Sequence, residues 1–170
     1  MYIAMGNEDP KSLRKPERRL LDDRVELIIG EVTGIDEEAG KVTLADDTAL
    51  DYDHLILATG SRILPEAIEN FEQEAHHFYS EEAAQKLRHA LDAFTGGKVV
   101  VGIAGMPYKC PPAPLEVALL IESELRDRGL RDKSEIHFCS PIARAFTIES
   151  VSEMVTPELE KKGVELHTFF

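Results

Sequence analysis

The chain has 170 residues and 43% of them are hydrophobic, so it can bury a core and is not a disordered protein. Its 19 basic residues against 32 acidic ones give a formal net charge of -13, which argues against nucleic acid and anionic lipid as partners, because both require a basic face. The 2 cysteines are too few for a secreted disulfide framework, and no apolar run reaches the roughly 18 residues that cross a bilayer.

The first third of the chain predicts a β-meander. Short segments with apolar residues at alternate positions are separated by polar turns, which is the pattern of antiparallel strands joined by tight connections. We expect these strands at residues 25–29, 31–36, 41–44 and 49–52, with turns at residues 37–40 and 46–48.

The next segment differs because its apolar run is nearly continuous. Residues 54–58 (His-Leu-Ile-Leu-Ala) precede Thr59 and Gly60, and such a run predicts a strand buried on both faces, as in a parallel sheet. Residues 61–79 are expected to form a linker. Ser80, followed by two glutamates, predicts the N-cap of a helix that ends near Phe94.

From residue 96 onward the pattern alternates strand, helix, strand, helix, strand, which predicts a right-handed βαβαβ half of a doubly wound fold. The strands are expected at residues 98–104, 135–139 and 164–169, and the first helix at 114–128. The second helix is expected to be capped by Thr147 or Ser150, to be interrupted by Pro157, and to stop at Gly163. The predicted fold class is therefore α/β, a Rossmann-like unit with a parallel sheet, preceded by a β-meander.

The order of these elements resembles the flavin-dependent pyridine nucleotide–disulfide oxidoreductases, in which an Ala-Thr-Gly strand end closes the FAD domain. The resemblance implies that residues 1–62 are the C-terminal part of the first FAD-binding domain, that 63–95 are a linker and helix, and that 96–170 are a degenerate NAD-type domain. Thr59 and Gly60 would lie at FAD, since a glycine at a strand end lets the backbone approach a ligand. Val32 would contact the adenine through its backbone.

The resemblance covers the whole chain as an internal segment. The first βαβ unit of the family, with its Gly-x-Gly-x-x-Gly turn, has no counterpart in these residues. We therefore expect the 170-residue chain by itself to bind FAD weakly or not at all, and to be inactive.

A nicotinamide-binding unit would have Gly-x-Gly-x-x-Gly after the strand at residues 98–104. Gly102 and Gly105 do not have this spacing, and the turn that should surround phosphate contains the prolines at 107, 111, 112 and 114. Proline removes the backbone N–H groups that pyrophosphate needs. No acidic residue follows the strand at 135–139 to bind a ribose. The pattern indicates that NAD(P)H binding has been lost.

The loop at residues 107–116, in which Cys110 is followed by two prolines, resembles the sulfide:quinone oxidoreductase and flavocytochrome c sulfide dehydrogenase family. The resemblance implies that the parent protein oxidises sulfide at Cys110 together with a second cysteine beyond residue 170, and passes electrons through FAD to a quinone or haem acceptor. Cys110 precedes a predicted helix, whose dipole together with Lys109 favours the thiolate that attacks sulfur. We expect a prokaryotic protein of the cytoplasm or the membrane periphery, and a homodimer formed through open sheet edges.

Other residues receive plainer interpretations. Cys139 is expected to be a buried cysteine on a strand, and His76 and His77 to be exposed linker residues, so that no metal site is predicted. Two further functions stay open: an NAD(P)H-dependent disulfide reductase or type II NADH dehydrogenase, and a non-catalytic interaction module, in which Cys110 would be buried and inert.

Overall fold

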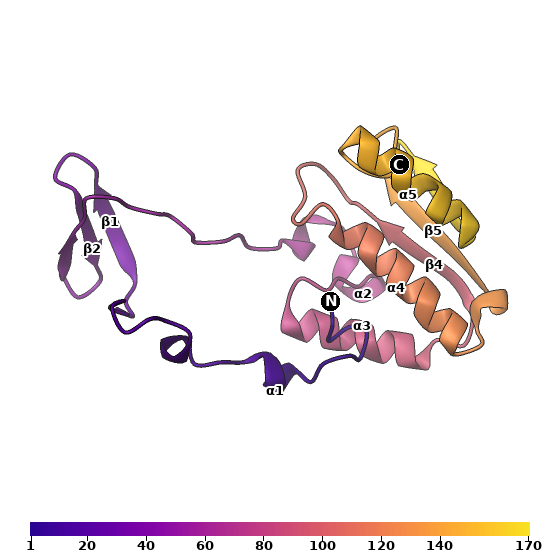
Figure 1. Cartoon of the computed structure of the whole chain (residues 1–170), viewed down its shortest axis with the longest axis horizontal. Coiled ribbons are helices and arrows are strands. Elements are labelled where there is room, and N and C mark those ends of the chain that lie inside the picture. The colour runs from indigo at the N-terminus through magenta and orange to yellow at the C-terminus, as the bar shows by residue number, and fades with distance from the viewer. The chain divides into compact units, whose positions relative to one another are not determined.

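Two separate three-stranded sheets, one antiparallel and one parallel, make up the β-structure of the chain in a computed structural model that describes residues 1–170 (Figure 1). The residues pack as two units. Unit 1 comprises Met1–Pro10 and Asn70–Phe170, and unit 2 comprises Lys11–Glu69. The α/β class with a meander before a parallel sheet is confirmed, while the functional division at residues 62 and 95 stays a prediction.

Unit 2 contains the predicted meander. Strands β1 (Val32–Asp36), β2 (Lys41–Leu44) and β3 (Ala49–Asp51) pair antiparallel in chain order. Gly40 occupies the turn before β2 with a φ of 62°, and a Cβ there would lie 3.1 Å from the carbonyl oxygen of Tyr52. Two short 3-10 helices, Glu17–Arg19 and Pro65–Ala67, lie outside the sheet.

Two predicted strands of unit 2 are wrong. Residues 25–29 form no strand, and Ile29 is 89% exposed. Residues 54–60 form no strand either, and Ile56 and Leu57 are 86% and 66% exposed. An apolar strand is held by hydrogen-bonded neighbours and by cover on both faces. The parallel sheet of this chain consists of three later strands, so residues 54–60 have no neighbouring strand to pair with.

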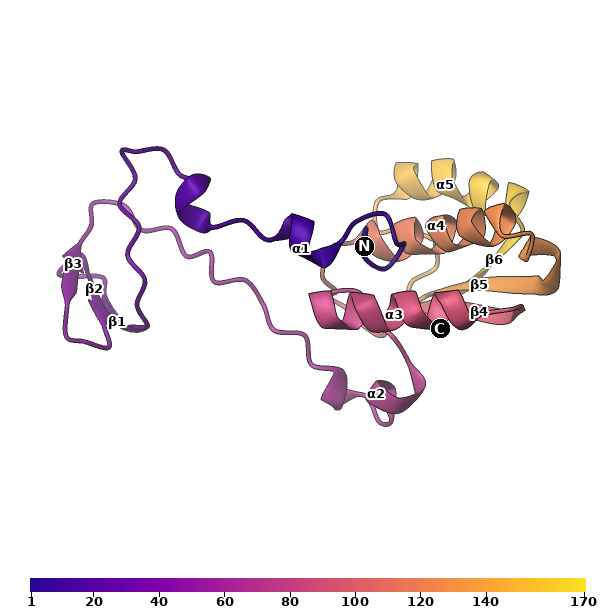
Figure 2. The same cartoon turned by 90° about the horizontal axis from the view of Figure 1, so that it is seen from below.

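Unit 1 is built on the parallel sheet, ordered β4 (Gly97–Gly102), β5 (Ser134–Ser140) and β6 (Val164–Thr168). Helix α4 (Ala113–Asp127) connects β4 to β5, and α5 (Glu149–Lys161) connects β5 to β6. These two helices cover one face of the sheet (Figure 2). The predicted strand–helix–strand–helix–strand order is confirmed, with ends that agree within a few residues.

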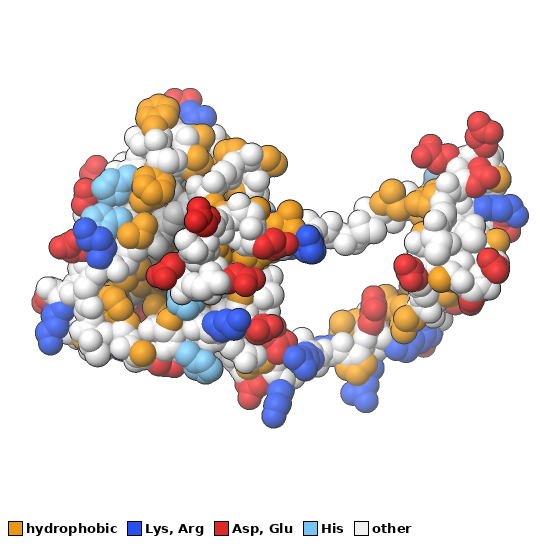
Figure 3. Space-filling model, turned by 180° about the vertical axis from the view of Figure 1, so that it is seen from behind, with side chains coloured by type: hydrophobic (Ala, Val, Ile, Leu, Met, Phe, Trp, Pro, Cys, Tyr) orange, Lys and Arg blue, Asp and Glu red, His pale blue; other side chains and the backbone are white.

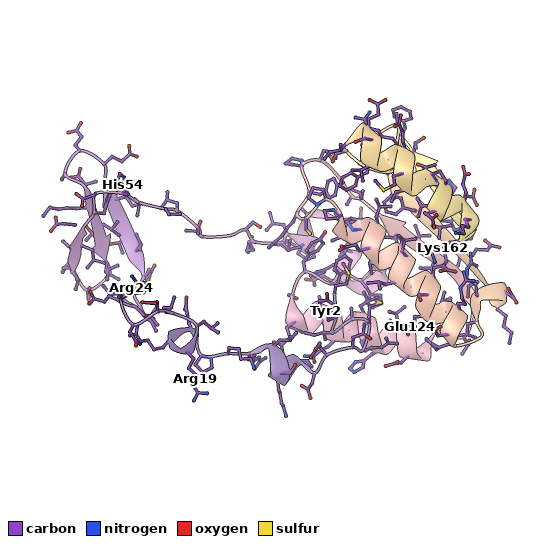
Figure 4. All side chains as sticks on the ribbon, viewed as in Figure 1. Tyr2, Arg19, Arg24, His54, Glu124 and Lys162 are labelled. Atoms are coloured by element: carbon purple, nitrogen blue, oxygen red, sulfur yellow. The ribbon has the colours of Figure 1, made fainter.

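Helix α3 (Glu81–Ala93) precedes β4 and lies beside α4 (Figure 4). Ser80 caps it, since the hydroxyl accepts a hydrogen bond from the Ala83 N–H at 3.2 Å, as predicted. Arg88 joins α3 to α4 through a hydrogen bond of 3.0 Å to Glu124. Short elements complete the chain: α1 (Pro10–Leu13), α2 (Phe71–Glu74) and a 3-10 helix at Arg131–Lys133.

The core of unit 1 lies between the sheet and the helices. Ile136 and Phe138 of β5 are buried completely or nearly so, together with Ala118 and Leu125 of α4 and Leu159 of α5. Successive side chains of a strand point to opposite faces, so these residues of β5 define the face that α4 and α5 cover. The side chains at positions 135, 137 and 139 belong to the other face.

The start of α5 differs from its prediction. Ile148 is the N-cap, without a side-chain cap, and Ser150 lies inside the helix, so the predicted cap by Thr147 or Ser150 is wrong. Pro157 does not interrupt α5 either. Leu159, two residues after Pro157, is completely buried, and this packing offsets the loss of one backbone hydrogen bond at the proline. Gly163 ends the helix as predicted, with a φ of 66°.

Candidate functional site

The loop between β4 and α4 presents Cys110 to solvent. It follows the carboxyl end of a parallel strand, the edge at which open α/β sheets bind ligands. Cys110 is exposed and has a φ of 57°, a left-handed conformation that is uncommon for a residue with a Cβ. Its carbonyl oxygen accepts a hydrogen bond of 3.0 Å from the Ala113 N–H, which fixes the thiol-bearing residue to the first turn of α4.

Tyr79 supports this loop from the segment before α3. Its hydroxyl donates a hydrogen bond of 2.8 Å to the carbonyl oxygen of Lys109. Burial raises the pKa of Tyr79, and the neighbouring Cys110 and Tyr108 groups raise it further through their negative charge when ionised. Tyr79 therefore stays protonated over the neutral range and can keep donating. Its ring stacks on Phe78, with 4.9 Å between ring centroids.

The first turn of α4 offers few donors to an anion. Pro114 has no N–H, and the N–H groups of Ala113 and Glu116 are already bonded to the carbonyls of Cys110 and Pro112. Glu116 also brings a negative charge into this turn. A pyrophosphate bound at a helix start needs free N–H groups and a positive field. This turn favours the expectation that NAD(P)H binding has been lost.

The second cysteine has a different environment. Cys139 lies on β5 and is 4% exposed, which confirms the expected burial. Burial raises the pKa of the Cys139 thiol, so the thiol stays protonated and poorly nucleophilic.

Of the two linker histidines, His76 is exposed, as expected, whereas His77 is half-buried. Burial and then the charge of Lys86 lower the pKa of His77, and its Nδ1 accepts a hydrogen bond of 3.3 Å from the Tyr79 N–H. His77 thereby supports the backbone that carries Tyr79.

The residues expected at FAD lie in unit 2, whereas Cys110 lies in unit 1. Val32 begins β1 and is 53% exposed. Thr59 and Gly60 are exposed and follow β3 along the chain, outside any helix or strand. Gly60 has a φ of 72°, and apart from its own chain neighbours no atom lies within 4 Å of the position a Cβ would take, so the backbone there is open to approach.

One cluster of possible metal ligands was not predicted from the sequence. His137, Glu165 and His167 come together on β5 and β6, and their ligating atoms lie within 4.8 Å of one another. The cluster could have been found only by aligning the two strands in register, because 30 residues separate the two histidines along the chain.

A family model described as pyridine nucleotide-disulphide oxidoreductase matches residues 3–169. The mitochondrial sulfide:quinone oxidoreductase of Dictyostelium discoideum is 24% identical over 95% of this chain and 37% of its own length. The sulfide-quinone reductase of Aquifex aeolicus is 30% identical over 81% of this chain and 32% of its own length. Rhodocoxin reductase of Rhodococcus erythropolis is 32% identical over 84% of this chain and 31% of its own length. The chain thus spans about a third of the length of these relatives.

Solved structures show the same fold. The sulfide:quinone oxidoreductase of Aquifex aeolicus matches 99% of this chain and 41% of that one, with a TM-score of 0.74 and 23% identity. A ferredoxin reductase of Rhodopseudomonas palustris matches 99% of this chain and 39% of its own chain, with a TM-score of 0.62 and 25% identity. None of the helices has the length and apolar character needed to span a membrane. On the match of nearly its whole length to the family model, the chain belongs to the pyridine nucleotide-disulphide oxidoreductases.

Proposed function

We propose that the chain is a segment of a FAD-dependent oxidoreductase that oxidises sulfide through Cys110 and passes the electrons through the flavin to a quinone or haem acceptor. The observation that carries the proposal is the exposed position of Cys110 at the start of α4, whereas Cys139 is buried. The similarity to two sulfide:quinone enzymes supports it. A quinone acceptor also favours a place at the membrane periphery.

The proposed chemistry balances at the sulfur. The Cys110 thiolate and hydrosulfide form one sulfur–sulfur bond, giving a persulfide, and release one proton and two electrons. A quinone that takes up the two electrons and two protons becomes a quinol. The chain's part in this step is to present an accessible thiolate on a loop that Tyr79 and α4 hold in place.

We propose that FAD contacts exposed backbone in unit 2. Gly60 offers an exposed backbone in the left-handed region, and Thr59 beside it is also exposed. Val32 is accessible on β1. FAD, when bound, supplies the two-electron carrier between sulfur and the final acceptor. Because these are only a few contacts, we expect weak or no FAD binding by the isolated chain.

Two other functions receive less support. An NAD(P)H-dependent disulfide reductase or type II NADH dehydrogenase is compatible with the pyridine nucleotide-disulphide oxidoreductase family, but the donor-poor start of α4 disfavours a bound pyrophosphate. A non-catalytic interaction module requires a buried Cys110, and this cysteine is exposed. A homodimer also stays a proposal, and a monomeric mass by light scattering would count against it.

Thiol reactivity tests the proposal on this chain. Iodoacetamide should alkylate Cys110 much faster than Cys139, and brief treatment with polysulfide should leave an added sulfur on the Cys110 peptide in mass spectrometry. The Cys139→Ala variant is the matched control and should react like the unaltered chain. If Cys110 were alkylated as slowly as a buried thiol, the proposed catalytic role of Cys110 would be wrong.

Activity is tested in a longer protein that carries this segment. Sulfide added without oxygen should bleach its flavin, and Cys110→Ala should abolish the bleaching while Cys139→Ala retains it. Bleaching by NADH but not by sulfide would instead support the disulfide reductase.

A further inference from the structure

We propose that His137, Glu165 and His167 form a binding site for a divalent transition-metal ion such as Zn²⁺, on the face of the parallel sheet opposite α4 and α5. The proposal is independent of the sulfide chemistry. Two imidazole nitrogens and a carboxylate are a known zinc ligand set, which leaves a fourth position for water or another ligand.

The sheet register brings the three side chains together. His137 of β5 pairs with Glu165 of β6, and the next position on the same face pairs Cys139 with His167. These side chains share the face opposite buried Ile136 and Phe138. On that face, Val100 of β4 pairs with His137 and is 57% exposed, so the sheet is open to solvent beside the cluster. Adjoining histidine side chains are visible on the surface in Figure 3.

The ligand atoms are spaced closely enough to surround one ion, since one from each residue lies within 4.8 Å of the others. Nδ1 of His137 lies 2.9 Å from Nε2 of His167. Oε2 of Glu165 lies 3.4 Å from Nδ1 of His137, and Oε1 of the same carboxylate lies 3.5 Å from Nε2 of His167. Ligands at the zinc–nitrogen bond length on a tetrahedral ion are about 3.3 Å apart. Both carboxylate distances are close to this spacing, and a small rotation of the half-exposed His167 ring would widen the separation of the two imidazole nitrogens to it.

A second layer of residues prepares His137 for a metal. Its Nε2 is buried and has no hydrogen-bond partner, while a carboxylate oxygen of Glu135 lies 3.5 Å away. Lys98 in turn pairs with Glu135 at 3.3 Å. A metal on Nδ1 places the proton on Nε2, directed at Glu135, which is the carboxylate–histidine–metal arrangement of protein zinc sites.

Charge also favours a cation over a bare hydrogen bond between the rings. Glu165 and Glu135 contribute two negative charges, and Lys98 contributes one positive charge, so the cluster with neutral imidazoles has a net negative charge. A divalent ion engages all three groups at once and neutralises the carboxylate.

Calorimetric titration of the EDTA-treated 170-residue chain with Zn²⁺ tests the proposal. We expect one ion per chain, and with Co²⁺ the visible absorption of a tetrahedral site. His167→Ala should weaken binding about 100-fold, since it removes a ligand, and Glu135→Gln about 10-fold, since it removes the partner of Nε2. Both side chains are at least partly exposed, so circular dichroism should show an intact fold.

The matched control is His76→Ala, an exposed histidine outside the cluster, which should bind Zn²⁺ like the unaltered chain. Equal losses in His76→Ala and His167→Ala would assign the ion to scattered surface histidines and overturn the proposal. An absence of Zn²⁺ binding would overturn it as well and leave a hydrogen bond between the two rings.

Discussion

Tyr79 ties the loop of Cys110 to the segment before α3 through a single side-chain hydrogen bond. Tyr79→Phe removes the bond to Lys109 and should lower the free energy of unfolding at pH 7 by about 1 kcal/mol in urea titrations. Because the pKa of Tyr79 is raised in the folded state, the folded chain holds this proton more tightly. The stability that Tyr79 contributes in this way is fully present below the ordinary tyrosine pKa and is lost as the pH rises through the raised pKa of the folded state.

Tyr79→Phe should accordingly reduce the stability lost on going to alkaline pH. Part of the loss should remain, since burial also raises the pKa of Tyr108. Tyr2→Phe is the control, because Tyr2 is 67% exposed and should have no measurable effect. An unchanged alkaline loss in Tyr79→Phe would mean that Tyr79 ionises as freely in the folded chain as in the unfolded one.

Glu122 is the other residue whose charge matters to the fold, because its side chain on α4 is completely buried. Burial raises the pKa of Glu122, but hydrogen bonds from Arg126 and Lys162 outweigh it and leave the pKa below its usual value. Lys162, labelled in Figure 4, directly follows α5. Its Nζ donates a hydrogen bond of 3.2 Å to the Glu122 carboxylate. A lowered folded-state pKa adds stability above the unfolded value, and this part is lost as the pH falls through the folded pKa.

Glu122→Gln should therefore destabilise the chain by about 1–3 kcal/mol at pH 7 and by clearly less at pH 3, because pH 3 lies below the ordinary carboxyl pKa and part of the stability from the lowered pKa is already lost there. Thermal unfolding at the two pH values measures the difference. Glu153→Gln on the exposed side of α5 should change neither value. Equal destabilisation by Glu122→Gln at both pH values would show that shape rather than charge matters at this position.

At the scale of elements, α3 and α5 begin in opposite ways. Ser80→Ala removes the cap of α3 and should cost about 1 kcal/mol of unfolding free energy, whereas Ser150→Ala lies inside α5 and should be neutral or slightly stabilising. Urea titration of both variants decides the point. If Ser150→Ala lowered the free energy of unfolding as much as Ser80→Ala, Ser150 would be the N-cap of α5 after all, as the sequence predicted.

The contrast shows what could be predicted from sequence. Ser80 is followed directly by two glutamates, a local signal, and the cap and α3 are where it places them. The apolar run at residues 54–60 signals a buried strand, but a strand depends on neighbours that its own residues do not specify. The cluster of His137, Glu165 and His167 depends on the register of β5 and β6, which no local pattern states. The cap of α3 and the order of elements in unit 1 could therefore be predicted from sequence, whereas the strand register and the partners of residues 54–60 could not.

At the scale of the whole molecule, the two units differ in how far their backbone is protected from proteases. Arg62 lies in residues 52–64, which contain no helix or strand, and its side chain is 79% exposed. Arg88 and Arg131 of unit 1 are 16% and 20% exposed and hold several hydrogen bonds. A protease must bind several residues in extended form, so cleavage at Arg62 needs no unfolding and cleavage at Arg88 does.

Brief trypsin treatment should therefore cut after Arg62 early and let a fragment of residues 63–170 accumulate in mass spectra. Arg62→Gln should remove this fragment without slowing the cuts near Arg24, whose side chain is 91% exposed. The fragment should persist because the core between β4, β5, β6 and their helices contains no residue of unit 2. Ala4 and Met5 pack into the same core, so the segment at residues 1–10 should stay bound to the fragment after the cut. Early cuts after Arg88 or Arg131 would contradict this packing, since both arginines would then have to leave their partners on α4 and at the end of α5.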